Sequence, residues 1–444
     1  MVFKDEWPGL GKTTKVRQVS SFTDTFLSDN QILDDSVLAR YEIVLPGFTG
    51  RMTPEKAEAL SKNPNVDFVE PDKSVSLAGF RSNNSNRKAI RSTAAATTAS
   101  SQVVPWGIAR VAGPADGTGK KAWILDTGID LDHPDLNVDV TNSISFVPGE
   151  TPDDLNGHGT HVAGILAAKD NDIDVVGVAA GATVVAVKVL DSNGRGQNSW
   201  IIDGLDHVVQ NGSNNHIINM SLGGPKSSSM DEAVKNTGIR TVVAAGNDGG
   251  DANNYSPARV ENYNVLTISA FESNDNFASF SNHSNPPIDF SGPGVNVYSL
   301  WKNGGTDFLD GTSMATPHIA GMVLMQGNSF LPYDGTVTND PDGTPDKIAR
   351  LPSDVEAYIS GPSFVSSGSE GTWTVQASGG VPPFEYDWQR NEYDPPHWEY
   401  LHDSDDSYSE TVTEYFELRV EVTDATNTVI FTPVFTVATG SSSF

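Results

Sequence analysis

The middle of the chain, residues 102–331, alternates short apolar runs with segments of helical pattern. The apolar runs are nearly continuous, which is typical of strands that are buried on both faces. Helices between such strands cover both faces of a parallel sheet, so we predict an α/β domain with a parallel sheet. In these domains functional residues gather beyond the carboxyl ends of the strands. The predicted strands are 122–125, 183–190, 217–220, 241–244 and 265–268, and the predicted helices are 161–168, 199–210, 230–237 and 313–325.

The uneven distribution of charge indicates further units on either side of this domain. Residues 1–100 carry 13 Lys/Arg and 12 Asp/Glu, residues 101–350 carry 13 and 29, and residues 351–444 carry 2 and 16. The segment 79–101 is rich in Ser, Asn, Ala and Thr, which predicts a flexible linker. The segment 332–360 begins with a stretch rich in Asp, Pro, Gly and Thr, which predicts a connector.

The two outer units differ in pattern. Residues 1–78 read as a small α+β module with its core at about 39–77. Residues 361–444 contain short β-branched and aromatic runs between polar turns, which predicts an all-β, immunoglobulin-like sandwich. The predicted elements are strands 39–45 and 66–69 and helix 54–60 in the first unit, and strands 372–376, 385–388, 411–413, 416–423 and 429–437 in the last.

The composition excludes several classes of protein. The chain has no cysteine, so a thiol nucleophile, a thiolate zinc site and a disulfide framework are all excluded. A formal net charge of −29 disfavours nucleic acid and anionic lipid as partners. No apolar run approaches the roughly 20 residues that cross a bilayer. Lys4, Asp5 and Glu6 interrupt the first residues, so we expect an export signal to be absent from this sequence or already removed.

Three segments carry the residue types that nucleophilic catalysis needs. Asp126 ends a predicted strand, and alone it would be read as a strand-end turn residue. His158 lies 32 residues later between two glycines at a helix start, and Ser313 opens a helix a further 155 residues on. A serine hydroxyl needs a base to remove its proton, and the imidazole needs a carboxylate to fix its tautomer. Asn247, which follows a predicted strand, could donate to an oxyanion together with the backbone N–H of Ser313.

These segments resemble the subtilisin-like serine proteases. The strings are Asp-Thr-Gly at 126–128, His-Gly-Thr-His-Val-Ala-Gly at 158–164 and Gly-Thr-Ser-Met-Ala at 311–315. The resemblance covers about half of the chain, from 102 to 321, and the last two strings are highly specific together. Gly-Thr-Ser-Met-Ala lacks the second glycine of the α/β-hydrolase elbow, which disfavours that fold.

The resemblance implies a role for each of these residues. Asp126 would orient His158, which would act first as general base and then as general acid. Ser313 would attack the peptide carbonyl to form an acyl-enzyme, and Asn247 would stabilise the oxyanion. Ala245 and Gly246 would wall the pocket for the residue before the scissile bond, where Asp248 could favour a basic side chain or be a solvated loop residue. The residues that would pair with an extended peptide are Gly194, Gly196, Ser221, Leu222 and Gly223.

The resemblance also implies a structural calcium ion. The segment 169–175 is rich in carboxylates and amides, which hard cations prefer, although a polar surface loop would look the same. A second site at Asp289 and a third at 339–343 are weaker candidates, and the third also fits an acidic turn. The implied ligands are the side chains of Gln102, Asp135 and Asn171 and the carbonyls of Lys169, Ile173 and Val175.

Two further histidines need an interpretation. His158 and His161 lie three residues apart, as a metal pair could. No Glu or Cys completes a zinc set and no HExxH motif is present, so we expect packing or hydrogen-bonding roles for His161 and His318.

The first unit resembles the propeptide inhibitor of these proteases, and the last resembles immunoglobulin-like or polycystic-kidney-disease-type modules. The first resemblance implies an N-terminal segment that places its end in the cleft, with self-cleavage near Ala78 or later around Ser100. We therefore predict a secreted, monomeric, calcium-stabilised serine endopeptidase of broad specificity that acts on polypeptides and is made as a self-inhibited precursor. A processing protease of narrow specificity remains open, and so does an inactive binding protein on the same fold.

Overall fold

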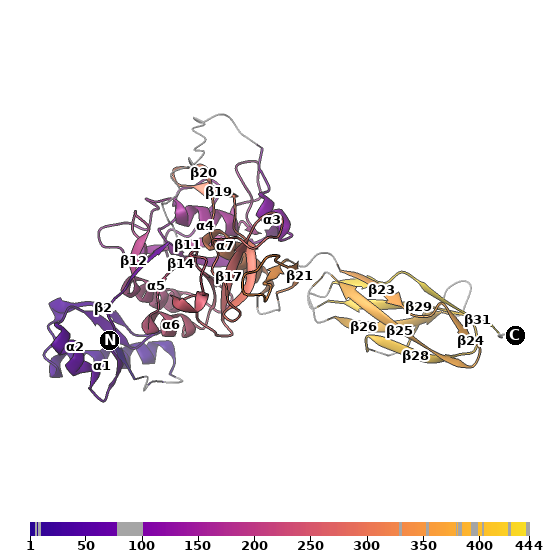
Figure 1. Cartoon of the computed structure of the whole chain (residues 1–444), viewed down its shortest axis with the longest axis horizontal. Coiled ribbons are helices and arrows are strands. Elements are labelled where there is room, and N and C mark those ends of the chain that lie inside the picture. The colour runs from indigo at the N-terminus through magenta and orange to yellow at the C-terminus, as the bar shows by residue number, and fades with distance from the viewer. Residues whose placement is uncertain are drawn as a thin grey trace. The chain divides into compact units, whose positions relative to one another are not determined.

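Figure 1 shows the computed structural model of the chain, which forms two compact units, Met1–Gly327 with Tyr333–Arg350 and Asn328–Pro332 with Leu351–Phe444. The predicted linker at 79–101 lies outside the described residues except for Ser101. Within the described ranges, no helix is long and apolar enough to cross a membrane. The structure describes residues 1–4, 7, 10–77, 101–327, 331–351, 355–378, 380, 384–391, 398–401, 404–424 and 428–440.

A sheet of ten strands forms the centre of the first unit. Its strands are β7 (Lys121–Asp126), β8 (Asn137–Val138), β9 (Ile144–Ser145), β11 (Thr183–Lys188), β13 (Ile217–Met220), β15 (Arg240–Ala244), β17 (Val265–Phe271), β18 (Ile288–Pro293), β21 (Tyr333–Thr336) and β22 (Lys347–Ala349). The order is β21-β22-β18-β17-β15-β13-β7-β11-β8, and β9 also pairs with β11. From β18 to β11 all neighbours run parallel, which confirms the predicted α/β fold with a parallel sheet.

Helices cover both faces of this sheet. They are α3 (Trp106–Arg110), α4 (His158–Ala167), α5 (Asn198–Asn211), α6 (Ser228–Lys235) and α7 (Thr312–Gln326). Trp123 and Leu125 of β7 lie in one core with Leu205 of α5. Because side chains alternate along a strand, Asp126 is on the same face as Ile124 and opposite to Leu125. Helix α4 contacts both β7 and α7.

The segment after α7 differs from the prediction. We expected residues 332–360 to be a connector, but residues 333–350 add β21 and β22 to the central sheet beside β18. Val337 and Ile348 are buried there with Phe271 and Phe277, so burial of apolar side chains holds this extension in place.

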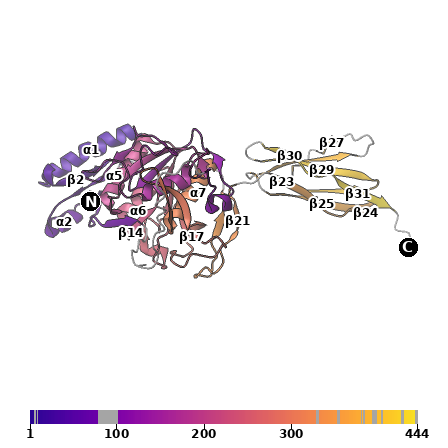
Figure 2. The ribbon, with the colours of Figure 1, turned by 90° about the horizontal axis from the view of Figure 1, so that it is seen from above.

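The N-terminal domain, residues 1–77, has a four-stranded sheet in the order β2-β3-β1-β4. Its elements are β1 (Val2–Phe3), α1 (Lys12–Asp29), the 3-10 turn η1 (Asp34–Ser36), β2 (Val37–Tyr41), β3 (Gly47–Gly50), α2 (Pro54–Ser61), β4 (Val66–Phe68) and β5 (Ser74–Leu77). Phe3, Phe26 and Phe48 pack in its core. Figure 2 shows this domain beside α5 and α6.

The second unit is a β-sandwich of two sheets, β23-β25-β28 and β24-β31-β29-β26-β27, with β30 paired to β29. Its strands are β23 (Glu356–Ser360), β24 (Phe364–Ser366), β25 (Ser369–Ser378), β26 (Glu385–Asn391), β27 (Glu399–Tyr400), β28 (Ser407–Val412), β29 (Phe416–Thr423), β30 (Val429–Phe431) and β31 (Phe435–Gly440). Trp373, Trp388 and Phe416 are fully buried in its core. The predicted strand at 429–437 is two strands, because the chain leaves the sheet between Phe431 and Phe435.

Candidate active site

Asp126 lies at the carboxyl end of β7 and is completely buried. Its Oδ1 accepts hydrogen bonds from the backbone N–H of Thr127 (2.7 Å) and from Nδ1 of His158 (2.8 Å). A buried carboxylate is costly unless it is hydrogen-bonded, and these two bonds offset part of that cost. The structure therefore brings the predicted acid and base into direct contact.

His158 is the first residue of α4, three residues before the predicted helix start. Gly157 has φ 116°, a left-handed conformation that lets the chain turn sharply into the helix. A Cβ at Gly159 would lie 2.0 Å from the carbonyl oxygen of Gly128, so only glycine fits there. The carboxylate of Asp154 accepts from the N–H groups of Gly157 (2.8 Å) and Thr160 (3.0 Å) at the helix start.

Ser313 is the second residue of α7 and is almost completely buried. Its hydroxyl donates to the carbonyl oxygen of Ser221 at 3.1 Å, while the Ser221 hydroxyl donates back to the carbonyl of Ser313 at 2.8 Å. The Ser313 hydroxyl thus donates to a backbone carbonyl and not to His158 among the hydrogen bonds of the described residues. Transfer of the Ser313 proton to His158 requires the hydroxyl to turn.

Asn247 follows β15 and lies beside the start of α7. Its Oδ1 accepts from the N–H of Thr312 at 2.8 Å, and its Nδ2 lies 3.2 Å from the position of a Cβ on Gly311. The donor end of this amide is therefore turned toward the beginning of the helix that carries Ser313. No sequence motif points to Asn282, whose amide anchors this segment by donating to the carbonyl of Ala245 and accepting from the N–H of Asp248.

A strand of the N-terminal domain occupies the predicted peptide-binding edge. β5 lies between β12 (Arg195–Gln197) and β14 (Leu222–Pro225), and β16 (Tyr255–Ser256) pairs with β14. The N–H of Leu77 donates to the carbonyl of Gly194 at 3.1 Å, and Leu77 is opposite Leu222. Ser76 is opposite Gly223, and Val75 is opposite Gly196. Strand β5 therefore contacts four of the predicted peptide-binding residues, Gly194, Gly196, Leu222 and Gly223. Ser221 instead bonds to Ser313, and the N–H of Gly246 donates to the hydroxyl of Thr312.

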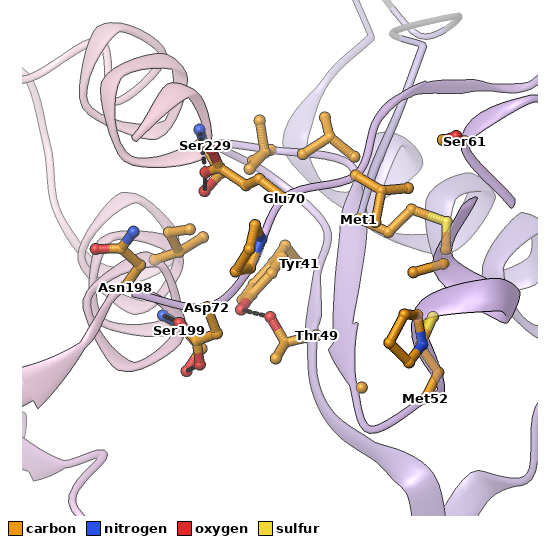
Figure 3. A pocket seen from close by; sticks show the side chains of 18 of the residues that line it. Met1, Tyr41, Thr49, Met52, Ser61, Glu70, Asp72, Asn198, Ser199 and Ser229 are labelled. Atoms are coloured by element: carbon orange, nitrogen blue, oxygen red, sulfur yellow. Dashed lines mark hydrogen bonds between the residues drawn. The ribbon is translucent and has the colours of Figure 1, made fainter. Parts of the chain in front are cut away.

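Carboxylates of the N-terminal domain also bind the helix starts of the catalytic part, as Figure 3 shows. Asp72 accepts from the N–H (3.0 Å) and hydroxyl (2.7 Å) of Ser199 in the first turn of α5. Glu70 accepts from the N–H of Ser229 (2.9 Å) at the start of α6. Helix N-termini favour negative charge, so both contacts stabilise docking. The residues of both contacts line a cavity of about 540 Å³, and Tyr41 lines the same cavity.

The three side chains implied as calcium ligands lie together. The amide of Asn171 donates to Oδ1 of Asp135 at 2.6 Å, and Oε1 of Gln102 accepts from the N–H of Asn171. Burial raises the pKa of Asp135 to about 6. This set of one buried carboxylate and two amide oxygens has the donor chemistry that calcium prefers. The side chain of Lys169 points to the carbonyl of Pro134, so only its backbone oxygen is a candidate ligand.

Two other histidines are fully buried and make hydrogen bonds to the backbone. Nε2 of His161 lies 3.2 Å from the carbonyl of Asp307, and Nδ1 of His318 lies 2.8 Å from the carbonyl of Met314. Burial lowers the pKa of His161 to about 3 and that of His318 to about 4, so both rings are neutral near pH 7.

Comparisons with known proteins find two family models, several relatives and a solved structure that are similar to this chain. Residues 117–331 match the model of the Subtilase family, and residues 3–78 match the model of Peptidase inhibitor I9. M-protease of Shouchella clausii (strain KSM-K16) is 38% identical over 322 residues, which cover 70% of this chain and 76% of that protein. Subtilisin BL of Lederbergia lenta is 46% identical over 235 residues, which cover 50% of this chain and 84% of that protein. A solved cold adapted subtilisin-like serine proteinase is 33% identical, with a TM-score of 0.49 over 57% of this chain and 100% of that one.

Proposed function

This chain belongs to the subtilase family of serine endopeptidases, and we propose that it is a secreted enzyme of broad specificity made as a self-inhibited precursor. The observation that carries the proposal is the position of β5, an extended segment of the chain itself, in the edge between β12 and β14. The last residue of this strand, Leu77, pairs with Leu222, which directly follows the residue whose carbonyl accepts from the Ser313 hydroxyl.

The proposed reaction follows from these groups. Asp126 holds the tautomer of His158 whose Nε2 is free to take the proton of Ser313. The Ser313 oxygen attacks the peptide carbonyl, and the oxyanion receives hydrogen bonds from Nδ2 of Asn247 and the N–H of Ser313. His158 then gives the proton to the leaving amine, and water hydrolyses the acyl-enzyme by the same steps.

Broad specificity is supported by the kind of contact that β5 makes. The edge pairs with backbone groups of residues 74–77, and backbone groups are common to every peptide. Secretion is proposed because an inhibitory domain would keep the enzyme inactive until it has left the cell. Detection of the processed enzyme in the culture medium and not in the cells would support this.

We also propose a structural calcium ion held by Asp135, Asn171 and Gln102, with the carbonyls of Lys169, Ile173 and Val175. When bound, the ion supplies positive charge beside the buried carboxylate of Asp135, so it stabilises the fold and takes no part in the chemistry.

The variant Ser313→Ala tests the proposed mechanism, because it removes only the attacking oxygen. We expect casein hydrolysis to fall by at least about 10³-fold, as for other proteins with this arrangement. Ser213→Ala makes the same change at an exposed serine and serves as the control. Hydrolysis by Ser313→Ala at the parent rate would refute the proposal.

A further inference from the structure

Lys188 is a fully buried lysine in the strand next to Asp126. It is the last residue of β11 and lies directly opposite Asp126 of β7. Its ammonium group donates to the carbonyl oxygens of Thr127 (2.6 Å) and Asp153 (3.1 Å). A buried charge is expensive unless it is paired and hydrogen-bonded, so this arrangement costs stability that an apolar residue would not.

The two carbonyls belong to the two segments that carry the acid and the base. Thr127 directly follows Asp126, and its hydroxyl donates to the carboxylate of Asp154 at 2.9 Å. Asp153 directly precedes Asp154, whose carboxylate accepts hydrogen bonds from backbone N–H groups at the start of α4, where His158 lies. The ammonium group of Lys188 therefore links the backbone beside Asp126 to the backbone that leads to His158.

Glu150 is the counter-ion of Lys188, and its hydrogen bond to Ser192 connects Lys188 to the turn before β12 at the peptide-binding edge. Oε2 of Glu150 lies 3.1 Å from Nζ of Lys188. Oε1 of Glu150 accepts from the N–H of Ser192 at 3.4 Å, and the carbonyl of Ser192 accepts from the amide of Asn156 at 3.0 Å. Ser192 lies in the turn that precedes β12, whose residues pair with the occupying strand.

We propose that Lys188, with Glu150 as its counter-ion, is a positioning residue that fixes the distance between Asp126 and His158 and sets the electrostatic potential at the imidazole. This inference rests on the proposed function, because it gives Lys188 a role in the same reaction. Lys188 does not touch the substrate. Its charge acts on His158 together with the other titratable groups packed around it, namely Asp126, Asp154 and His161.

The test compares Lys188→Met, which keeps the length and removes the charge, with Lys188→Arg and Glu150→Gln. Each full chain is allowed to process itself, and active sites are counted by labelling with a fluorophosphonate. With a short chromogenic peptide we expect kcat of Lys188→Met to fall about 100-fold, since a misplacement of about 1 Å has that effect, while KM changes by less than about threefold. Lys188→Arg should recover most of kcat because it restores the charge.

The pH profile separates positioning from a merely structural role. A nearby cation disfavours the imidazolium, so its removal in Lys188→Met should move the acid limb of kcat/KM to higher pH. Glu150→Gln removes an anion and should move that limb to lower pH. Opposite shifts support the inference, and shifts that are absent or of the same sign overturn it.

Three further outcomes separate the role of Lys188 from the proposed function. If Lys188→Met does not fold, Glu150→Gln still decides, since its side chain is 19% exposed and keeps its shape, and an unmoved acid limb in that variant overturns the inference. If Ser313→Ala remains fully active, the proposed function itself fails. If Ser313→Ala is inactive while Lys188→Met keeps the parent kcat and pH profile, only the inference about Lys188 fails.

Discussion

Individual residues at the site are constrained by the backbone that surrounds them. Gly159 shows this most directly, because the carbonyl oxygen of Gly128 fills the space where a side chain would begin. Any substitution there must push the start of α4 away from β7, and His158 moves with it. Stability and catalysis therefore depend on the same atom-level contact.

At this scale we predict that Gly159→Ala lowers both stability and activity. Overpacking against a backbone atom costs about 1–3 kcal/mol, and displacement of His158 should reduce kcat about 100-fold. Thermal unfolding and peptide hydrolysis measure the two effects. Gly250→Ala is the control, because no atom lies within 4 Å of its Cβ position. Unchanged kcat in Gly159→Ala would contradict the prediction.

The residues of the site were predictable to different degrees. Asp126, His158, Ser313 and Asn247 stand in short, glycine-rich strings at the ends of strands or the starts of helices, so the sequence indicates them directly. The direction of the Ser313 hydroxyl depends on a carbonyl 92 residues away, and no local pattern encodes it. Lys188 was visible as a charged residue in an apolar run, but its partners are all distant in sequence.

At the scale of elements, the buried parallel strands were predictable because each is a continuous apolar run. Helix α1 was not predicted, because Val19, Phe26 and Leu27 are its few buried apolar residues in an otherwise polar segment. Such a helix is stabilised mainly by tertiary packing. The sequence predicts a connector where β21 and β22 lie, because Asp, Pro and Gly dominate the residues around them.

The segment 169–175 supports a prediction about calcium. We expect excess EDTA to lower the melting temperature by about 5–10 °C, because a ligand at about 100 times its Kd stabilises by roughly 2.7 kcal/mol. The variant Asp135→Asn removes the buried carboxylate and should make the melting temperature insensitive to EDTA. An unfolding curve of the parent chain that EDTA leaves unmoved would remove the calcium assignment.

At the scale of the whole molecule, inhibition depends on how the N-terminal domain binds α5 and α6. Asp206 of α5 accepts hydrogen bonds from the backbone N–H groups of Glu42 and Val44, each at 2.7 Å. Asp203 lies one helical turn away, near Tyr41. Burial, reinforced by the charges of Asp206 and Asp72, raises the pKa of Asp203 to about 8. Docking therefore favours the protonated form of Asp203.

This arrangement predicts that the pH dependence of inhibition contains a contribution from Asp203. When the domain leaves, the pKa of Asp203 should return toward the usual value of about 4, so docking takes up a proton between these values. The contribution favours docking at low pH and is lost as the pH rises toward about 8. The inhibition constant of the parent enzyme, divided by that of the Asp203→Asn variant at the same pH, should rise by up to about tenfold per pH unit between pH 5 and 8.

The comparison with Asp203→Asn isolates this carboxyl from other titrating groups. Burial raises the pKa of Asp206, and burial also lowers the pKa of the Met1 amine to about 6, but both groups are present in parent and variant. A ratio that stays constant from pH 5 to 8 would show that Asp203 does not titrate on docking.

The most direct test of the account is mass spectrometry of the purified chain incubated alone. We expect the chain to cut itself beyond β5, between residues 78 and 101, and we expect Ser313→Ala to stay intact under the same conditions. A parent chain that never shortens, or a Ser313→Ala chain that shortens at the same site and rate, would contradict it.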